Sequence, residues 1–95
     1  MQYRIRYEKR TLREDVPKIP VANREQIGRA IRERLAVAPV ELGEPLTGKF
    51  VGLRRLRVGD WRIIYKVEPG VVSIHAIRIR RDAYKGWKPS LNPEF

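Results

Sequence analysis

The sequence predicts an α+β domain with the order β-α-α-β-β-β, in which two N-terminal helices pack on an antiparallel sheet. Apolar residues in the first half of the chain recur at helical spacing. Those in the second half alternate as in strands, and turn residues separate the strands. The 95 residues contain no internal repeat and no linker, so residues 1–95 are expected to form a single domain.

The chain is expected to begin with a strand and a short helix. Apolar residues alternate with arginines over residues 3–7, which is typical of a strand. Residues 11–15 are predicted to be helical, with Leu12 and Val16 four positions apart on one face. Pro17 is expected to end this helix, because proline lacks the amide donor that a continuing helix needs.

A longer helix is predicted over residues 21–37. Ile27, Ile31 and Leu35 recur at every fourth position and form an apolar stripe, while most of the positions between them are charged and suit a solvated face. Pro39 lies just beyond the predicted end of the helix, where proline is common.

The second half of the chain is predicted to be a three-stranded meander. A loop over residues 41–48 leads into it, and residues 85–95 are expected to form a short C-terminal tail. The strands are rich in β-branched and aromatic residues, and both turns contain glycine. The predicted strands are residues 53–58, 61–67 and 71–80, and the predicted turns are residues 59–60 and 68–70.

The formal net charge is +10, and most of it lies in the second half. Residues 1–48 carry ten Lys and Arg against seven Asp and Glu, a net charge of +3. Residues 49–88 carry eleven against three, a net charge of +8. This asymmetry favours a polyanionic partner, nucleic acid above all.

Composition excludes several other classes of protein. No apolar run approaches the ~20 residues of a spanning helix, and the N-terminus lacks the apolar core of a signal peptide. A cytoplasmic protein without a membrane partner is therefore expected. The absence of cysteine excludes a disulfide framework and a thiolate nucleophile. The single histidine, His75, excludes a histidine-rich metal site, although an ion held by carboxylates stays open.

Strand alternation is expected to gather arginines on one face of the meander. Arg55 and Arg57 project together from the first strand, and neighbouring strands lie about 5 Å apart. On the third strand, Arg78 and Arg80 are expected to share a face with Ile74 and Ala76. The expected patch consists of Arg55, Arg57, Arg62 and Arg80, with Tyr84 one turn further on.

Such a patch suits the cleavage of RNA. Guanidinium groups bind phosphate bidentately and stay charged, so they can stabilise a pentacoordinate phosphorane. RNA brings its own nucleophile, the 2′-hydroxyl, whose attack leaves a 2′,3′-cyclic phosphate and a 5′-hydroxyl. Arginine is a poor base and a tyrosine such as Tyr84 has an ordinary pKa of about 10, so chemistry is expected to be slow without a partner. His75 is interpreted as a partly buried strand residue rather than a catalyst.

Several motifs resemble the RelE/ParE toxin superfamily. Residues 53–65 (LRRLRVGDWRIIY) follow residues 45–48 (PLTG), and residues 76–84 (AIRIRRDAY) match the closing strand of the superfamily and its Arg-x-x-x-Tyr ending. Residues 15–20 (DVPKIP), ahead of the long helix, are also similar. The resemblance covers about residues 2–84 and implies a RelE-like fold.

The resemblance to the RelE branch implies a toxin of a toxin–antitoxin module that cleaves messenger RNA on the ribosome. It implies that Arg55 contacts the region of the scissile phosphate and that Arg62 activates or stabilises the nucleophile. Arg80 is expected to stabilise the transition state or protonate the leaving group, and Tyr84 to stack on and orient the messenger base. A cognate antitoxin is expected to block this patch, and no cofactor or metal is expected. The further expected RNA contacts are Lys49, Arg54, Arg57, Arg78 and Arg81.

Two positions depart from the RelE pattern. Leu53 stands where RelE has a second catalytic lysine, and Ile79 where many relatives have a histidine. Either change implies a weaker nuclease or chemistry that depends more on the arginines.

The ParE branch, which shares the scaffold, inhibits DNA gyrase without cutting RNA and is the alternative. The set Arg55, Arg62, Arg80 and Tyr84 favours the RelE branch. A domain that binds structured RNA without cutting it is a third hypothesis.

Overall fold

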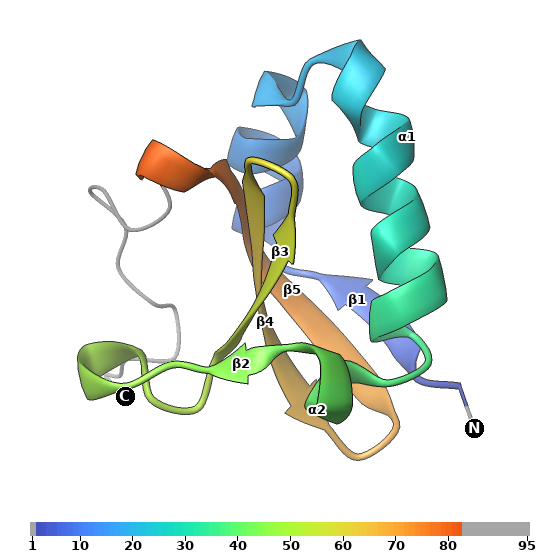
Figure 1. The fold of residues 1–95 in the computed structure, drawn as a ribbon, viewed down its shortest axis with the longest axis vertical. Coiled ribbons are helices and arrows are strands. Elements are labelled where there is room, and N and C mark those ends of the chain that lie inside the picture. Colours follow the sequence, from blue (N-terminus) through green and yellow to red (C-terminus); the bar gives the residue numbers. More distant parts are fainter. Residues whose placement is uncertain (1, 83–95) are drawn as a thin grey trace.

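A five-stranded mixed sheet forms the centre of the domain, and α1 (Val21–Ala30) lies against one of its faces (Figure 1). The computed structural model describes residues 2–82. The α+β class and the three-stranded meander predicted from the sequence are confirmed. The strands lie in the spatial order β1-β5-β4-β3-β2, and their bounds are β1 (Arg4–Tyr7), β2 (Glu44–Pro45), β3 (Arg54–Val58), β4 (Trp61–Glu68) and β5 (Val71–Ile79).

The prediction that the sheet is antiparallel is wrong for β1. This strand runs parallel to β5 and pairs with residues 71–74. The other neighbouring strands are antiparallel. A parallel pair needs a long crossover connection, and the helices that follow β1 provide part of it. β1 therefore lies beside the last strand of the meander rather than the first.

Both predicted helices are present. The short one consists of a π-helical segment, Thr11–Asp15, and a 3₁₀ turn, Val16–Lys18. The long one is α1, which continues as a second π-helical segment, Ile31–Leu35, and so ends two residues earlier than predicted. Within residues 2–82, no helix is long and apolar enough to cross a membrane.

The segment predicted as a loop contains further short elements. α2 (Pro39–Leu42) starts just before it, and β2 pairs with the first two residues of β3. Two residues are too few to give a periodic pattern, so the sequence does not reveal β2. The remaining 3₁₀ turns are Gly48–Phe50 and Arg80–Asp82.

The main core lies between the sheet and the helices. The apolar stripe of the long helix is buried, as predicted, against alternate residues of the meander. A smaller cluster lies on the opposite face, where Leu46 and Phe50 pack against Leu53, Ile64 and Ala76. The main core consists of Ile19, Ile27, Ala30, Ile31, Leu35, Leu56, Val58, Ile63, Tyr65, Val72, Ile74 and Ile77.

The segment Thr11–Asp15, hereafter the edge segment, covers the edge of β5 beyond the end of β1. Backbone groups at an open strand edge need hydrogen-bond partners. The Thr11 hydroxyl donates to this edge, 2.7 Å from the carbonyl oxygen of His75. The Asp15 carboxylate accepts the Ile77 N–H at 3.0 Å. The edge segment therefore completes the hydrogen bonding that β1 leaves open.

The predicted apolar face of the short helix is confirmed for Val16, which packs against the main core, but not for Leu12. Thr11 and Asp15 are buried, whereas Leu12 is 51% exposed. The reason is that the segment meets a strand edge, which offers backbone donors and acceptors and so selects polar partners.

An extra residue in β5, His75, changes the alternation of faces along this strand. Ile64 and Tyr65 are consecutive in β4 but pair with Ala76 and Ile74, so the register shifts by one residue at His75. Ile74 consequently lies in the main core, and Ala76 on the opposite face. The prediction that Ile74 shares a face with Ala76 is wrong, because strict alternation fails at a bulge.

Candidate nucleic-acid interface

Three arginines lie next to one another across the strands of the meander. Arg57 of β3 pairs in register with Arg62 of β4, which pairs in turn with Arg78 of β5. Neighbouring strands lie about 4.8 Å apart, and paired residues share a face of the sheet. We call these three residues the arginine row. Like charges directly opposite one another are unfavourable, so an anionic ligand on this face would stabilise the row.

Arg62 is the most confined member of the row, with 9% of its surface exposed. Its Nη1 donates to the carbonyl oxygens of Gly59 and Trp61, both at 2.9 Å, which fixes the guanidinium against the β3–β4 turn. Burial lowers the pKa of Arg62, and the positive charges of Arg57, Arg80 and Arg55 lower it further. These four arginines, hereafter the arginine cluster, are the patch that the sequence predicted.

Arg55 approaches the cluster from the β2 side. It forms an ion pair with Glu44, whose side chain is 56% exposed. The hydrogen bond from Arg55 and its charge hold the pKa of Glu44 below the ordinary value. In the structure, the Glu44 carboxylate therefore pairs with Arg55 as the phosphate of a bound nucleic acid could.

Arg80 follows the end of β5 and has an exposed side chain. Its backbone N–H donates to the carbonyl oxygen of Asp60 at 2.6 Å, which places it beside the β3–β4 turn. Its charge acts on Arg62. The fourth predicted catalytic residue, Tyr84, lies outside the described residues, as does the predicted tail.

Of the other predicted RNA contacts, Arg54 lies apart from the cluster. Its side chain donates to the carbonyl oxygens of Val40 and Gly43, at 2.6 and 2.9 Å, and so ties α2 to β3. Lys49 is exposed, with its Nζ 5.5 Å from the centre of the Phe50 ring. The arginine cluster, rather than these residues, forms the centre of the candidate interface.

The two departures from the RelE pattern have different surroundings. Leu53 is 1% exposed and belongs to the small apolar cluster opposite the helices. Ile79 pairs in register with Trp61. A lysine in place of Leu53 would enter an apolar environment, so this chain uses that position for packing.

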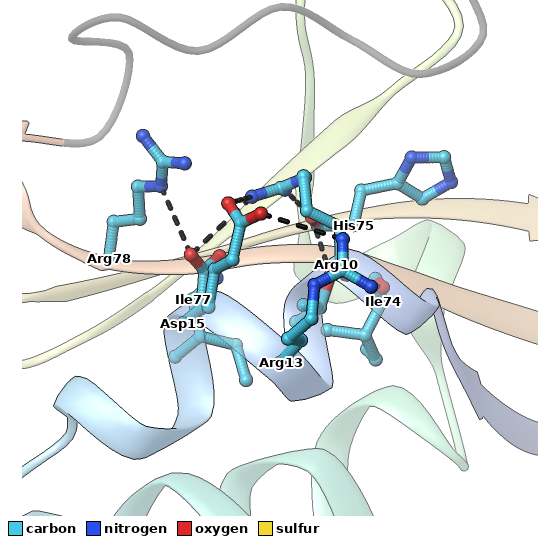
Figure 2. Close-up of polar contacts among 9 residues, drawn as sticks. Arg10, Arg13, Asp15, Ile74, His75, Ile77 and Arg78 are labelled. Carbon is cyan, nitrogen blue, oxygen red and sulfur yellow. Dashed lines mark hydrogen bonds and ion pairs between the residues drawn. The ribbon is translucent and has the colours of Figure 1, made fainter.

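Sequence reasoning missed Asp15, which is buried at the edge of β5. Its Oδ1 lies 3.6 Å from Nε of Arg78 and 3.5 Å from Nη1 of Arg10 (Figure 2). Asp15 is the acid of the DVPKIP motif, so the motif draws attention to it. Nothing in the sequence, however, indicates that Asp15 approaches Arg78. Asp15 also helps to line a pocket of about 510 Å³, together with Lys18, Pro20, Trp61, Ile77, Arg78, Ile79, Arg81 and Asp82.

No group of three or more His, Asp or Glu side chains within residues 2–82 is arranged to hold a metal ion. The described part of the site offers guanidinium groups, which bind anions. Such groups are able to bind an anion and to stabilise negative charge.

His75 lies in a different electrostatic environment from the cluster. It is 5% exposed, and Nε2 lies 3.9 Å from the Glu8 carboxylate. Burial lowers the pKa of His75, and Arg6, Lys66 and Arg10 lower it further against the opposing effect of Glu8. None of these residues belongs to the arginine cluster.

The free energy of unfolding is expected to decrease as the pH falls below about 6.5 because of His75. The unfolded chain binds a proton at that ordinary pKa, whereas the folded chain binds it only at lower pH, so stability rises with pH between the two values. Urea unfolding between about pH 5 and pH 8 measures this dependence. His75→Gln is expected to be less sensitive to pH over that range, and an unchanged sensitivity would contradict this account.

Comparison with models of known protein families gives a match over most of the chain. The model of the family described as ParE toxin of type II toxin–antitoxin system, parDE, matches residues 9–84. No curated protein shows a significant match in sequence.

Solved structures share the fold over most of their length. The RelBE2 toxin–antitoxin complex of Mycobacterium tuberculosis contains a chain with 25% sequence identity and a TM-score of 0.78, covering 86% of this chain and 95% of that one. The RelE–RelB complex of Pyrococcus horikoshii OT3 gives 27% identity and a TM-score of 0.64, covering 87% of this chain and 100% of that one. HP0894 of Helicobacter pylori, at 14% identity and a TM-score of 0.64 over 85% of this chain and 97% of its own, shows the fold alone.

Proposed function

The chain belongs to the RelE/ParE superfamily of toxins of type II toxin–antitoxin modules, and we propose that it is an endoribonuclease that cleaves messenger RNA on the ribosome. The observation that carries the proposal is the arginine cluster around Arg62. Four guanidinium groups that repel one another form a site whose natural ligand is a polyanion.

The proposed reaction is an internal transfer of the RNA phosphate. The 2′-oxygen attacks the neighbouring phosphorus and forms a new P–O bond, while the bond from phosphorus to the 5′-oxygen of the next nucleotide breaks. The 2′-hydroxyl proton is lost and the leaving 5′-oxygen gains a proton. The products are a 2′,3′-cyclic phosphate and a 5′-hydroxyl, and no water or metal is consumed.

The arginines act on the charge that develops during this transfer. Negative charge grows on the oxygens of the pentacoordinate phosphorus, and fixed cations stabilise it more than they stabilise the substrate. Arg62 suits this role because its two backbone hydrogen bonds hold it in place before RNA binds. Arg55 and Arg80 then bind the phosphate from the two sides, and Tyr84 remains our candidate for orienting the base.

The ribosome and the messenger RNA are the proposed partners during cleavage. Arginine is a poor base, and the histidine of the chain lies outside the cluster. Proton transfer and alignment of the 2′-oxygen therefore depend on the ribosome in this proposal. A cognate antitoxin is the second proposed partner. Of the similar structures, one is the RelBE2 toxin–antitoxin complex and another is a RelE–RelB complex.

The experiment that tests the proposal is primer extension on messenger RNA in cell-free translation, with purified protein and with or without ribosomes. Cuts that appear within codons only when ribosomes are present would support it. Equal cutting of free RNA would contradict the need for the ribosome. Normal translation without cuts would contradict the proposed activity altogether. A mock purification from cells that do not express the protein identifies cuts made by a contaminating nuclease, because such cuts would appear in it as well.

The second candidate function is inhibition of DNA gyrase. The observation that favours it is the matching family, which is described as the ParE toxin. A supercoiling assay with purified gyrase separates the two candidates. Loss of supercoiling at protein concentrations that leave messenger RNA uncut would favour the gyrase inhibitor.

A further inference from the structure

We propose that Asp15 is a positioning residue, which holds the guanidinium of Arg78 at one end of the arginine row. The proposal rests on the proposed cleavage of RNA, because it gives Arg78 a part in binding the RNA phosphate. Asp15 lies outside the arginine cluster, at the end of the edge segment, which the sequence predicts only to be a short helix.

The Asp15 carboxylate divides its contacts between backbone and side chains. It is 4% exposed, and Oδ2 accepts the N–H of Ile77 at 3.0 Å. Its other oxygen, Oδ1, faces two guanidinium groups, 3.6 Å from Nε of Arg78 and 3.5 Å from Nη1 of Arg10 (Figure 2). The hydrogen bond fixes the carboxylate to β5, so the oxygen that faces Arg78 is fixed as well.

Contact through Nε sets the direction of Arg78. Its side chain is 19% exposed, and its terminal nitrogens point away from Asp15 (Figure 2). An arginine that is already held at Nε loses less rotamer freedom when its terminal nitrogens bind a phosphate. Asp15 therefore prepares Arg78 for an anion without occupying the part of the guanidinium that binds it.

An acid lies at each end of the face that carries the arginines. Glu44 pairs with Arg55 at the β2 side, and Asp15 pairs with Arg78 at the β5 side. The side chain of Glu44 is 56% exposed, whereas that of Asp15 is 4% exposed. Salt and water weaken the exposed pair much more than the buried one. Glu44 can thus give way to a phosphate, while Asp15 stays with Arg78.

A double-mutant cycle of cleavage rates on programmed ribosomes tests the proposal. Asp15→Asn keeps an oxygen that can accept the Ile77 N–H but removes the charge. It is expected to lower kcat roughly tenfold, and Arg78→Met is expected to lower it at least as much. If Asp15 acts through Arg78, adding Asp15→Asn to Arg78→Met changes kcat by less than about twofold. Losses that multiply in the double variant would overturn the proposal, as would a wild-type kcat for Asp15→Asn.

Glu68→Gln is the matched control, because it removes an acid from an ion pair, the one with Lys66, at the end of β4 away from Arg62. It is expected to leave kcat unchanged. Far-ultraviolet circular dichroism of each variant reports whether the fold is kept. A wild-type protein that cuts nothing would refute the proposed function, whereas a cutting wild type with multiplicative losses refutes only the role of Asp15.

A measurement on the wild-type protein applies even if Asp15→Asn does not fold. The ¹H–¹⁵N signal of Arg78 Nε, assigned by its loss in Arg78→Lys, is expected to exchange with water more slowly than that of Arg29. Arg29 pairs with Glu25 through Nη2, and its side chain is 58% exposed. Equally fast exchange at the two sites would show that Asp15 does not hold Arg78.

Discussion

Arg62→Ala is expected to lower the rate of messenger RNA cleavage on the ribosome by roughly 10²-fold. Arg62 lies at the centre of the arginine cluster, and its Nη1 is held by two backbone carbonyl groups. A cation that is already in place stabilises the growing charge of the phosphorane without reorganising during the reaction. Removing it takes away an interaction that is strongest in the transition state. The loss is therefore expected in kcat more than in KM.

Single-turnover cleavage on programmed ribosomes measures this loss. Arg62 also joins the β3–β4 turn through Gly59 and Trp61, so thermal unfolding of the variant must be measured beside it. Arg80→Ala provides an independent variant. The Arg80 side chain is exposed, and the residue contacts the turn through its backbone N–H, so its removal is expected to leave the turn intact. A loss of similar size is expected for it. Arg29→Ala removes an exposed arginine of α1 and is expected to cut at the wild-type rate. Wild-type rates for both cluster variants would remove the proposed mechanism.

Gly43→Ala is expected to destabilise the fold by about 1–3 kcal/mol or more through overpacking. A Cβ at this position would lie 1.7 Å from the hydroxyl oxygen of Tyr65 and 2.8 Å from its Cζ. Tyr65 is fully buried and donates to the carbonyl oxygen of Pro39 at 2.7 Å, so its ring has no free space to move into. Either the ring or the start of β2 must shift. Urea unfolding at neutral pH measures the change in free energy.

The clash with the Tyr65 hydroxyl can be separated from other effects of the new methyl group. Tyr65→Phe is expected to cost about 1–3 kcal/mol by itself, because it leaves the buried Pro39 carbonyl without its donor. Gly43→Ala is then expected to cost less in the Tyr65→Phe background than in the wild type, although the contact with Cζ remains. An equal cost in both backgrounds would show that the hydroxyl is not the obstacle.

The same glycine connects packing to the candidate interface. A Cβ at Gly43 would also lie 3.1 Å from the backbone oxygen of Arg55. Glu44, the next residue, pairs with the Arg55 side chain. A shift of β2 is therefore expected to disturb Arg55, so a loss of cleavage in Gly43→Ala does not by itself assign a catalytic role to this residue.

Local sequence signals determined much of the fold. Alternation and turn glycines predicted the meander, and the apolar stripe of the long helix predicted its buried face. Alternation also predicted that Arg55, Arg57 and Arg62 meet on one face, because a hairpin with a tight turn fixes its own register. These features depend on residues close together in the chain, which is why sequence is sufficient for them.

Features that join distant segments were not predictable in this way. The pairing of β1 with β5 and the two-residue strand β2 have no periodic signature. The bulge at His75 shifts the residues on either side of it to opposite faces of β5. A break in the alternation of apolar and polar residues does not by itself reveal a bulge, because such breaks also occur in strands without one. Each of these results from competition among pairings over the whole sheet.

The sequence by itself determined the meander, its arginine-bearing face and the resemblance to a toxin superfamily. Only the tertiary structure decided which residues support that face. Thr11 and Asp15 are buried because β1 ends early and leaves donors and acceptors of β5 in need of partners. Asp15 contacts Arg78, which is distant in the sequence, because the edge segment packs along the part of β5 that β1 does not cover. A hydrogen-bonding demand created by strand pairing has no local pattern in the chain, so only the folded molecule reveals it.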